Sequence, residues 1–162
     1  MKISFTKKEF DTLKTTAEDA YKLIGAVRCP YLQTDIAFNA KGLDHLKLKR
    51  WNHGRAEKDQ FMRLKLLHLA PEILKQSRTL QGIKSSRHLE RMKIHSRWEE
   101  KLVPVTYYEF ISVQPTPHGD QSRVRIVVKQ IDGGQPYFWS IIPYWRQRDQ
   151  GKELFEGDPE ED

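Results

Sequence analysis

Apolar residues recur at helical spacing near the start of the chain. They fall at positions 10, 13, 17, 20, 21 and 24, which predicts a helix over residues 7–24 with one buried stripe. Thr6 and Glu9 have the spacing of a capping box at the start of this helix. Gly25 suits its C-terminal cap, so both ends of the helix are marked in the sequence.

The next stretch of the chain contains shorter elements. The pattern predicts an extended segment at 31–39, a short helix at 43–50, a loop at 52–58 and a helix at 58–69. Pro71 suits the first turn of one more short helix, because a helix leaves its first backbone N–H groups unpaired in any case.

The second half of the chain changes to a period of two. Residues 103–113, 123–131 and 136–143 are rich in β-branched and aromatic side chains, and residues 87–94 are ambiguous between strand and helix. Helices followed by an antiparallel meander indicate an α+β fold. We expect N-terminal helices to pack on one face of a roughly four-stranded antiparallel sheet, and the other face to remain open.

The last hairpin can be registered from its turn. If Gly133 and Gly134 form a two-residue turn, Val127 faces Ser140 and Lys129 faces Phe138. The apolar face would then carry Val124, Ile126, Val128, Tyr137, Trp139 and Ile141. The open face would carry Arg125, Lys129, Phe138, Ser140 and Ile142. A four-residue loop over residues 132–135 gives the same pairing, whereas a three-residue loop would reverse the faces, since side chains alternate along a strand.

The charge of the chain is unevenly distributed. The net charge is +6, but residues 151–162 hold one lysine and six acidic residues, so residues 1–150 carry 27 basic and 16 acidic residues and a charge of +11. We therefore expect one domain over residues 1–149 and a disordered acidic tail over residues 150–162. A domain this basic attracts polyanions, of which nucleic acid is the commonest.

A histidine lies in the predicted short helix, four residues before a lysine. His45 and Lys49 would share a helical face, and an imidazole ordinarily titrates near neutrality, which suits proton transfer. The six histidines show no metal-binding spacing, and Cys29 is the only cysteine. We expect no metal, no cofactor and no disulfide. The sequence shows neither a signal peptide nor a membrane-spanning run, so the expected compartment is the cytoplasm.

Three features together resemble a known family. They are the segment IAFNAKGLDHLKLKR at residues 36–50, a helical middle, and the final hairpin RVRIVVKQ…YFWSIIP. This combination resembles the phage-associated branch of the barnase–EndoU–colicin–RelE class of RNase toxins. The resemblance implies metal-independent cleavage of RNA, in which a ribose 2′-hydroxyl attacks the adjacent phosphorus. It also implies an acidic antitoxin or immunity protein as a partner.

Carried onto this chain, the resemblance implies a set of site residues. The catalytic residues would be His45, Lys129, Ser140 and Arg50, and substrate would be bound by Lys49, Arg125, Phe138 and Trp51. The second proton-transfer group stays open among His53, His88, Glu90 and Glu109.

Two other functions remain open. The protein would be a non-catalytic RNA- or DNA-binding or phage accessory protein if the basic face serves phosphates and base stacking alone. Alternatively, it would be a protein-interaction domain in which the acidic tail folds back on the basic surface.

Overall fold

The structure is a computed structural model that describes residues 3–50, 53–115, 118–143 and 158–162, without the side chain of Arg50. Its helices are α1 (Lys7–Ile24), α2 (Ala40–Lys47), α3 (Glu57–Leu66) and α4 (Ala70–Gln76), with a 3-10 turn at Leu67–Leu69. Its longer strands are β5 (Gly82–Ile94), β6 (Arg97–Pro115), β7 (Gln121–Ile131) and β8 (Tyr137–Pro143). Its shorter strands are β1 (Ala26–Cys29), β2 (Thr34–Ala37), β3 (Leu48–Arg50) and β4 (His53–Gly54).

The fold combines helices with one large mixed sheet. The order in this sheet is β1-β2-β8-β7-β6-β5, and all neighbours are antiparallel except β2 and β8, which are parallel. The expected four-stranded antiparallel sheet is therefore too small, because the short strands β1 and β2 extend it beyond β8. Strands β3 and β4 form a separate two-stranded ribbon next to α2.

Several elements agree with the sequence pattern. Helix α1 has the expected bounds, and the Thr6–Glu9 capping box is present. Gly25 follows with a φ of 69°, a conformation that glycine adopts without strain. The ambiguous segment at residues 87–94 belongs to β5, which turns into β6 through His95 and Ser96, both at positive φ.

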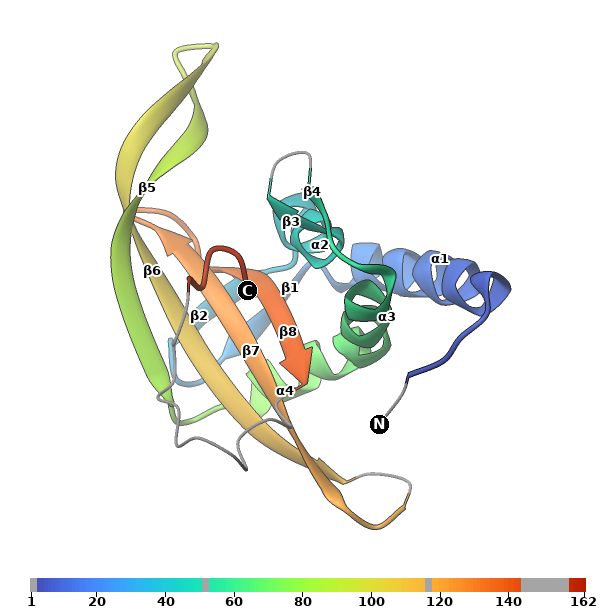
Figure 1. Cartoon of the computed structure of the whole chain (residues 1–162). Helices are drawn as coiled ribbons and strands as arrows, with labels where there is room; N and C mark the ends of the chain where they lie inside the picture. The colour runs from blue at the N-terminus through green and yellow to red at the C-terminus, as the bar shows by residue number, and fades with distance from the viewer. Residues whose placement is uncertain (1–2, 51–52, 116–117, 144–157) are drawn as a thin grey trace.

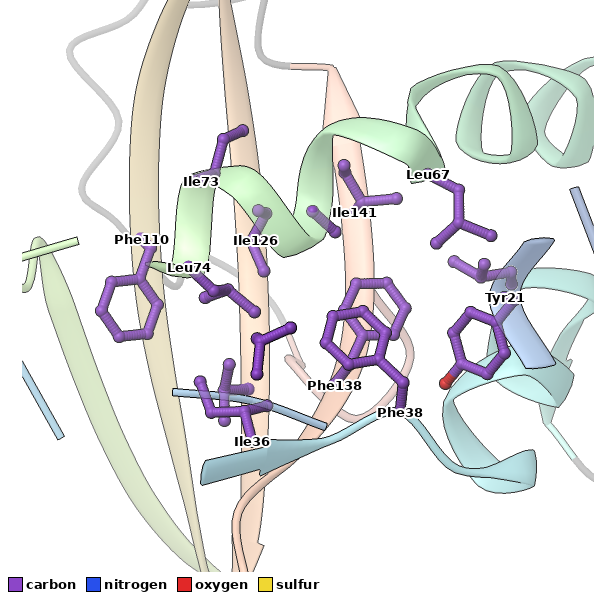
Figure 2. Packing of buried hydrophobic residues seen from close by; sticks show 14 of the residues in the cluster. Tyr21, Ile36, Phe38, Leu67, Ile73, Leu74, Phe110, Ile126, Phe138 and Ile141 are labelled. Atoms are coloured by element: carbon purple, nitrogen blue, oxygen red, sulfur yellow. The ribbon is translucent and has the colours of Figure 1, made fainter. Parts of the chain in front are cut away.

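The main core lies between the helices and one face of the sheet. Ile73 and Leu74 of α4 belong to the same buried cluster as Phe110 and Ile126, and in Figure 2 Leu74 lies between the Phe110 and Ile126 side chains. Farther along the same layer, the ring of Phe138 stacks on Phe38, with a centroid distance of 5.1 Å. Burial of these side chains fixes which face of β6, β7 and β8 lies under the helices.

The last hairpin departs from the predicted register at Trp139. Val127 pairs with Ser140 as expected, but Val128 pairs with Phe138, so Trp139 forms a bulge in β8. The extra residue moves Tyr137 to the face of Lys129 and turns Phe138 under the helices, where its exposure is 0%. Phe138 was wrongly placed on the open face, and it cannot stack on a base from its position in the core.

The end of the chain also departs from expectation. Residues 158–162 form a turn against the sheet face that lies opposite α4, in place of the disorder that their composition favours (Figure 1). Residues 150–157, the rest of the expected tail, lie outside the described residues. Within the described part of the chain, no helix is both long and apolar enough to cross a membrane.

Candidate functional site

Lys129 lies at the centre of the sheet face opposite α4. Its side chain is 1% exposed, and its Nζ lies 2.6 Å from Glu90 on β5 and 2.7 Å from Glu160. The same ammonium lies 4.2 Å from the centroid of the Trp139 ring. Burial of a lysine is costly unless carboxylates neutralise it, so the two contacts with Glu90 and Glu160 explain why it can stay there.

Arg125 lies four residues before Lys129 on β7 and therefore on the same face. Its Nε is 3.0 Å from Glu109, which is fully buried on β6, and its Nη1 is 3.0 Å from Asp162. Burial raises the pKa of Glu109, while the neighbouring Arg125 acts in the opposite direction. Each strand cation thus has one carboxylate partner within the sheet and one in the last turn of the chain.

Ser140 adds a hydroxyl to this face. It is fully buried, accepts a hydrogen bond of 2.5 Å from Arg63 Nη1, and donates one of 2.7 Å to the main-chain oxygen of Asp162. Arg63 also donates to that main-chain oxygen. Arg63 belongs to α3, which packs beside β8, so a helix reaches around the edge of β8 to complete the site.

Helix α2 brings His45 to the same place. The helix begins at its cap Asn39, and the Tyr21 hydroxyl donates a 2.7 Å hydrogen bond to the Asn39 carbonyl. Gly42 packs so closely on Phe138 that an added Cβ would lie 2.2 Å from the Phe138 carbonyl oxygen. One turn farther on, the His45 ring stacks on Trp139 with a centroid distance of 3.9 Å. Close packing at Gly42 therefore sets the position of His45.

His45 is buried and surrounded by positive charge. Its ring Nε2 lies 3.0 Å from Arg55 Nη2, and a guanidinium can only donate, so Nε2 accepts and the ring proton lies on Nδ1. Burial lowers the pKa of His45 to about 2, and Arg55, Arg63 and Lys129 add to the effect. The imidazole is therefore neutral at physiological pH, and far weaker as a base than a typical catalytic histidine.

Two arginines are joined through Asp59. Arg55 Nη1 lies 3.4 Å from Asp59 Oδ2, and Arg63 Nε lies 2.7 Å from Asp59 Oδ1. Burial, followed by repulsion from Arg63, lowers the pKa of Arg55 to about 10. We call Arg55, Arg63, Arg125 and Lys129 the cationic cluster. Its members come from the residue that precedes the α3 cap, from α3 itself and from β7, and they meet around Ser140 and Trp139.

Other predicted site residues lie at the margin of the site or beyond the described structure. Lys49 on β3 is about half exposed, and its Nζ lies 3.8 Å from Glu161. The backbone of Arg50 belongs to β3, but its side chain and the whole of Trp51 lie outside the described residues.

The four candidates for the second proton-transfer group are divided between two places. Glu90 and His88 are two residues apart on β5, so both lie on the face of the cationic cluster. The centroid of the His88 ring lies 6.0 Å from that of Tyr107. Glu109 lies on the same face beneath Arg125. His53 is exposed on β4 in the separate ribbon.

Sequence reasoning missed Arg55, Arg63, Tyr107 and the last turn of the chain. The arginines did carry a signal, because residues 55, 59 and 63 place Arg, Asp and Arg at helical spacing. Tyr107 lies across from Lys129, and its hydroxyl donates to Glu160. Burial, strengthened by the charge of Glu160, raises the pKa of Tyr107. Docking of residues 158–162 is expected from the sequence only under the alternative in which the acidic tail folds back on the basic surface.

The described residues contain no group of three or more His, Cys, Asp or Glu side chains arranged to hold a metal ion. Comparison of the chain with protein-family models, curated proteins and solved structures found no match. Evidence for a function therefore comes from the side chains of the site.

Proposed function

We propose that the protein is a metal-independent endoribonuclease whose substrate lies on the sheet face that carries the cationic cluster. We also propose that the protein is related to the barnase–EndoU–colicin–RelE class of RNase toxins. The observation that carries it is the convergence of Arg63, Arg125, Lys129 and Ser140 on carboxylate and carbonyl oxygens of a single short segment. Groups that hold carboxylate oxygens in this way are also suited to phosphate oxygens.

In this proposal the cations act on the scissile phosphate. Arg63 and Ser140 hold one non-bridging oxygen, in the position that the Asp162 main-chain oxygen occupies in the structure. Arg125 stabilises the charge that develops as the 2′-hydroxyl attacks phosphorus, and Lys129 contacts the neighbouring phosphate of the strand. The need for a 2′-hydroxyl confines cleavage to RNA. Trp139 contributes to the floor of the site through its contacts with Lys129 and His45.

We assign proton transfer to the β5 side chains rather than to His45. Glu90 lies beside Lys129, so its carboxylate is placed to accept the 2′-hydroxyl proton. His88 lies on the same face of β5 and can protonate the leaving 5′-oxygen. His45 acts as a positioning residue, because its Nε2 and its main-chain oxygen both bond Arg55, the latter at 2.8 Å. This assignment replaces the base role that the resemblance implied for His45.

The test is cleavage of a fluorescent oligoribonucleotide in EDTA. The wild type should cleave it and leave the matching DNA intact, while Glu90→Gln and His88→Ala should each lose at least about a hundredfold in rate, the usual share of a general acid or base. His118→Ala serves as the matched control, since His118 is exposed in the loop between β6 and β7. Equal rates for His88→Ala and His118→Ala would remove His88 from the mechanism.

Non-catalytic RNA binding is a second candidate, and one observation favours it. The histidine that the resemblance made catalytic is neutral, buried and bonded to Arg55. If the protein only binds, its affinity for RNA will fall steeply with salt, because each neutralised phosphate releases counterions. No RNA will then be cleaved at any salt concentration that permits binding.

A further inference from the structure

The last turn of the chain occupies the cationic cluster. Glu160 contacts Lys129 through both carboxylate oxygens, at 2.9 and 2.7 Å, and also accepts a hydrogen bond from Tyr107. Two residues later, the Asp162 carboxylate lies 3.0 Å from Arg125 Nη1. Arg63 and Ser140 both donate to the main-chain oxygen of Asp162. Every side chain that the proposed function assigns to phosphate contact therefore already holds an oxygen of this segment.

Apolar and main-chain contacts anchor the segment as well. Pro159 is buried, and its carbonyl oxygen accepts a 3.0 Å hydrogen bond from the indole nitrogen of Trp139. Arg55 Nη2 donates a 2.9 Å bond to the main-chain oxygen of Glu161. The segment thus lies along the cationic cluster, with Pro159 at Trp139 and Asp162 at Ser140. The Glu160 and Asp162 carboxylates contact the strand cations Lys129 and Arg125.

We propose that residues 158–162 are an intramolecular competitor of the substrate, filling two neighbouring anion subsites that take consecutive phosphates of an RNA strand. One subsite is formed by Lys129 and Tyr107, and the other by Arg63, Arg125 and Ser140. Glu160 and Asp162 are two positions apart, so their α-carbons are at most about 7 Å from each other. This inference rests on the proposed function only in taking RNA as the polyanion, and it does not require that the protein cleaves RNA.

Competition follows from the shared contacts. A strand can reach the subsites only in molecules whose segment has left them, so the apparent dissociation constant rises in inverse proportion to the fraction of open molecules. Because the segment is tethered to the domain, its effective concentration does not fall when the protein is diluted. Its hold depends on charge, and neutral isosteres should release it.

The experiment uses the full chain with the double substitution Glu160→Gln/Asp162→Asn. The control, Glu72→Gln/Asp120→Asn, removes the same charge from exposed positions on α4 and in the loop between β6 and β7. The probe is a 2′-O-methyl oligouridine, which cannot be cleaved because its attacking hydroxyl is blocked. If the segment covers the site in nine molecules of ten, its release should strengthen binding about tenfold, and the control should change it by no more than about twofold.

A second measurement follows the segment directly. The NMR signal of the Trp139 indole N–H should move in Glu160→Gln/Asp162→Asn, and it should move in the same direction when the oligouridine is added to the wild type, because both remove the Pro159 acceptor. Matching urea midpoints for the two double variants would show that both are folded.

Equal affinities in the two double variants would overturn the inference. It would also fail if Glu160→Gln/Asp162→Asn lost RNA cleavage without binding the oligouridine more tightly, since the segment would then supply groups to the site. The proposed function fails separately. A gain in oligouridine affinity with no cleavage of RNA by any variant would leave the competitor in place and remove the ribonuclease.

Discussion

The ion pair between Lys129 and Glu90 gives the sharpest stability prediction. Lys129→Met keeps a side chain of similar length but removes the charge that faces Glu90, whose exposure is 8%. The Oε1 atom of Glu90 has no hydrogen-bond partner among the described residues, although it lies 2.6 Å from Lys129 Nζ. Removal of one member of a buried pair costs about 3–5 kcal/mol, because the other charge is left uncompensated.

The reverse deletion should be milder. Glu90→Gln leaves Lys129 paired with Glu160, so we expect a loss of about 1 kcal/mol, the scale of one ordinary hydrogen bond. In the Lys129→Met background the same substitution removes an unpaired carboxylate and should therefore stabilise the protein. The sign of the effect of Glu90→Gln thus reverses between the two backgrounds, with a coupling energy of about 1–3 kcal/mol.

The assay is urea unfolding at pH 7, followed by far-ultraviolet circular dichroism for the wild type, both single variants and the double variant. A shift of the midpoint at constant slope measures the change in the free energy of unfolding. If Glu90→Gln has the same effect in both backgrounds, within about 0.5 kcal/mol, the two groups are not coupled and the reasoning is refuted.

Three further predictions concern the elements around the site. Gly42→Ala should destabilise the protein by about 1–3 kcal/mol in urea unfolding, because the alanine Cβ would clash with the Phe138 carbonyl and this outweighs the better helix propensity of alanine. An unchanged urea midpoint would contradict that packing. His45 binds a proton more weakly in the folded protein, where its pKa is about 2, than in the unfolded chain, where it titrates near 6.5. The contribution of His45 to the free energy of unfolding is therefore complete above pH 6.5 and declines by up to about 1.4 kcal/mol per pH unit as the pH falls toward 2. His45→Asn should flatten the decline in the free energy of unfolding between pH 7 and 5. Equal slopes in the wild type and the variant would argue against a buried neutral ring. Phe138→Leu should leave the affinity for 2′-O-methyl oligouridine unchanged, since this side chain lies under the helices; weaker binding by a folded variant would return Phe138 to the binding face.

Local sequence signals predicted a large part of the fold. The capping box at Thr6 and Glu9 and the following apolar stripe mark α1 from end to end. The pairing of Val127 with Ser140 was also predicted correctly, although the pairs nearest the turn are shifted by one residue from the prediction. Such signals involve neighbours in sequence or in one hairpin, so a single chain is sufficient to read them.

Non-local geometry accounts for what was missed. The bulge at Trp139 exchanged the faces of Phe138 and Tyr137, and it lies where Phe138 packs against Gly42 of α2, a contact between distant parts of the sequence. Arg63 enters the site because α3 passes the edge of β8, a placement that no periodicity in α3 reveals. The burial of His45 among three cations likewise depends on the assembled fold, and it changes the chemistry expected of the imidazole.

A crystal structure of the protein with bound 2′-O-methyl oligouridine is the most direct test of the claim that the cationic cluster is a phosphate site. We expect one phosphate within hydrogen-bond distance of Arg63 and Ser140, the next beside Lys129, and residues 158–162 displaced from both places. An oligonucleotide bound elsewhere, with Glu160 still seated on Lys129, would contradict the claim.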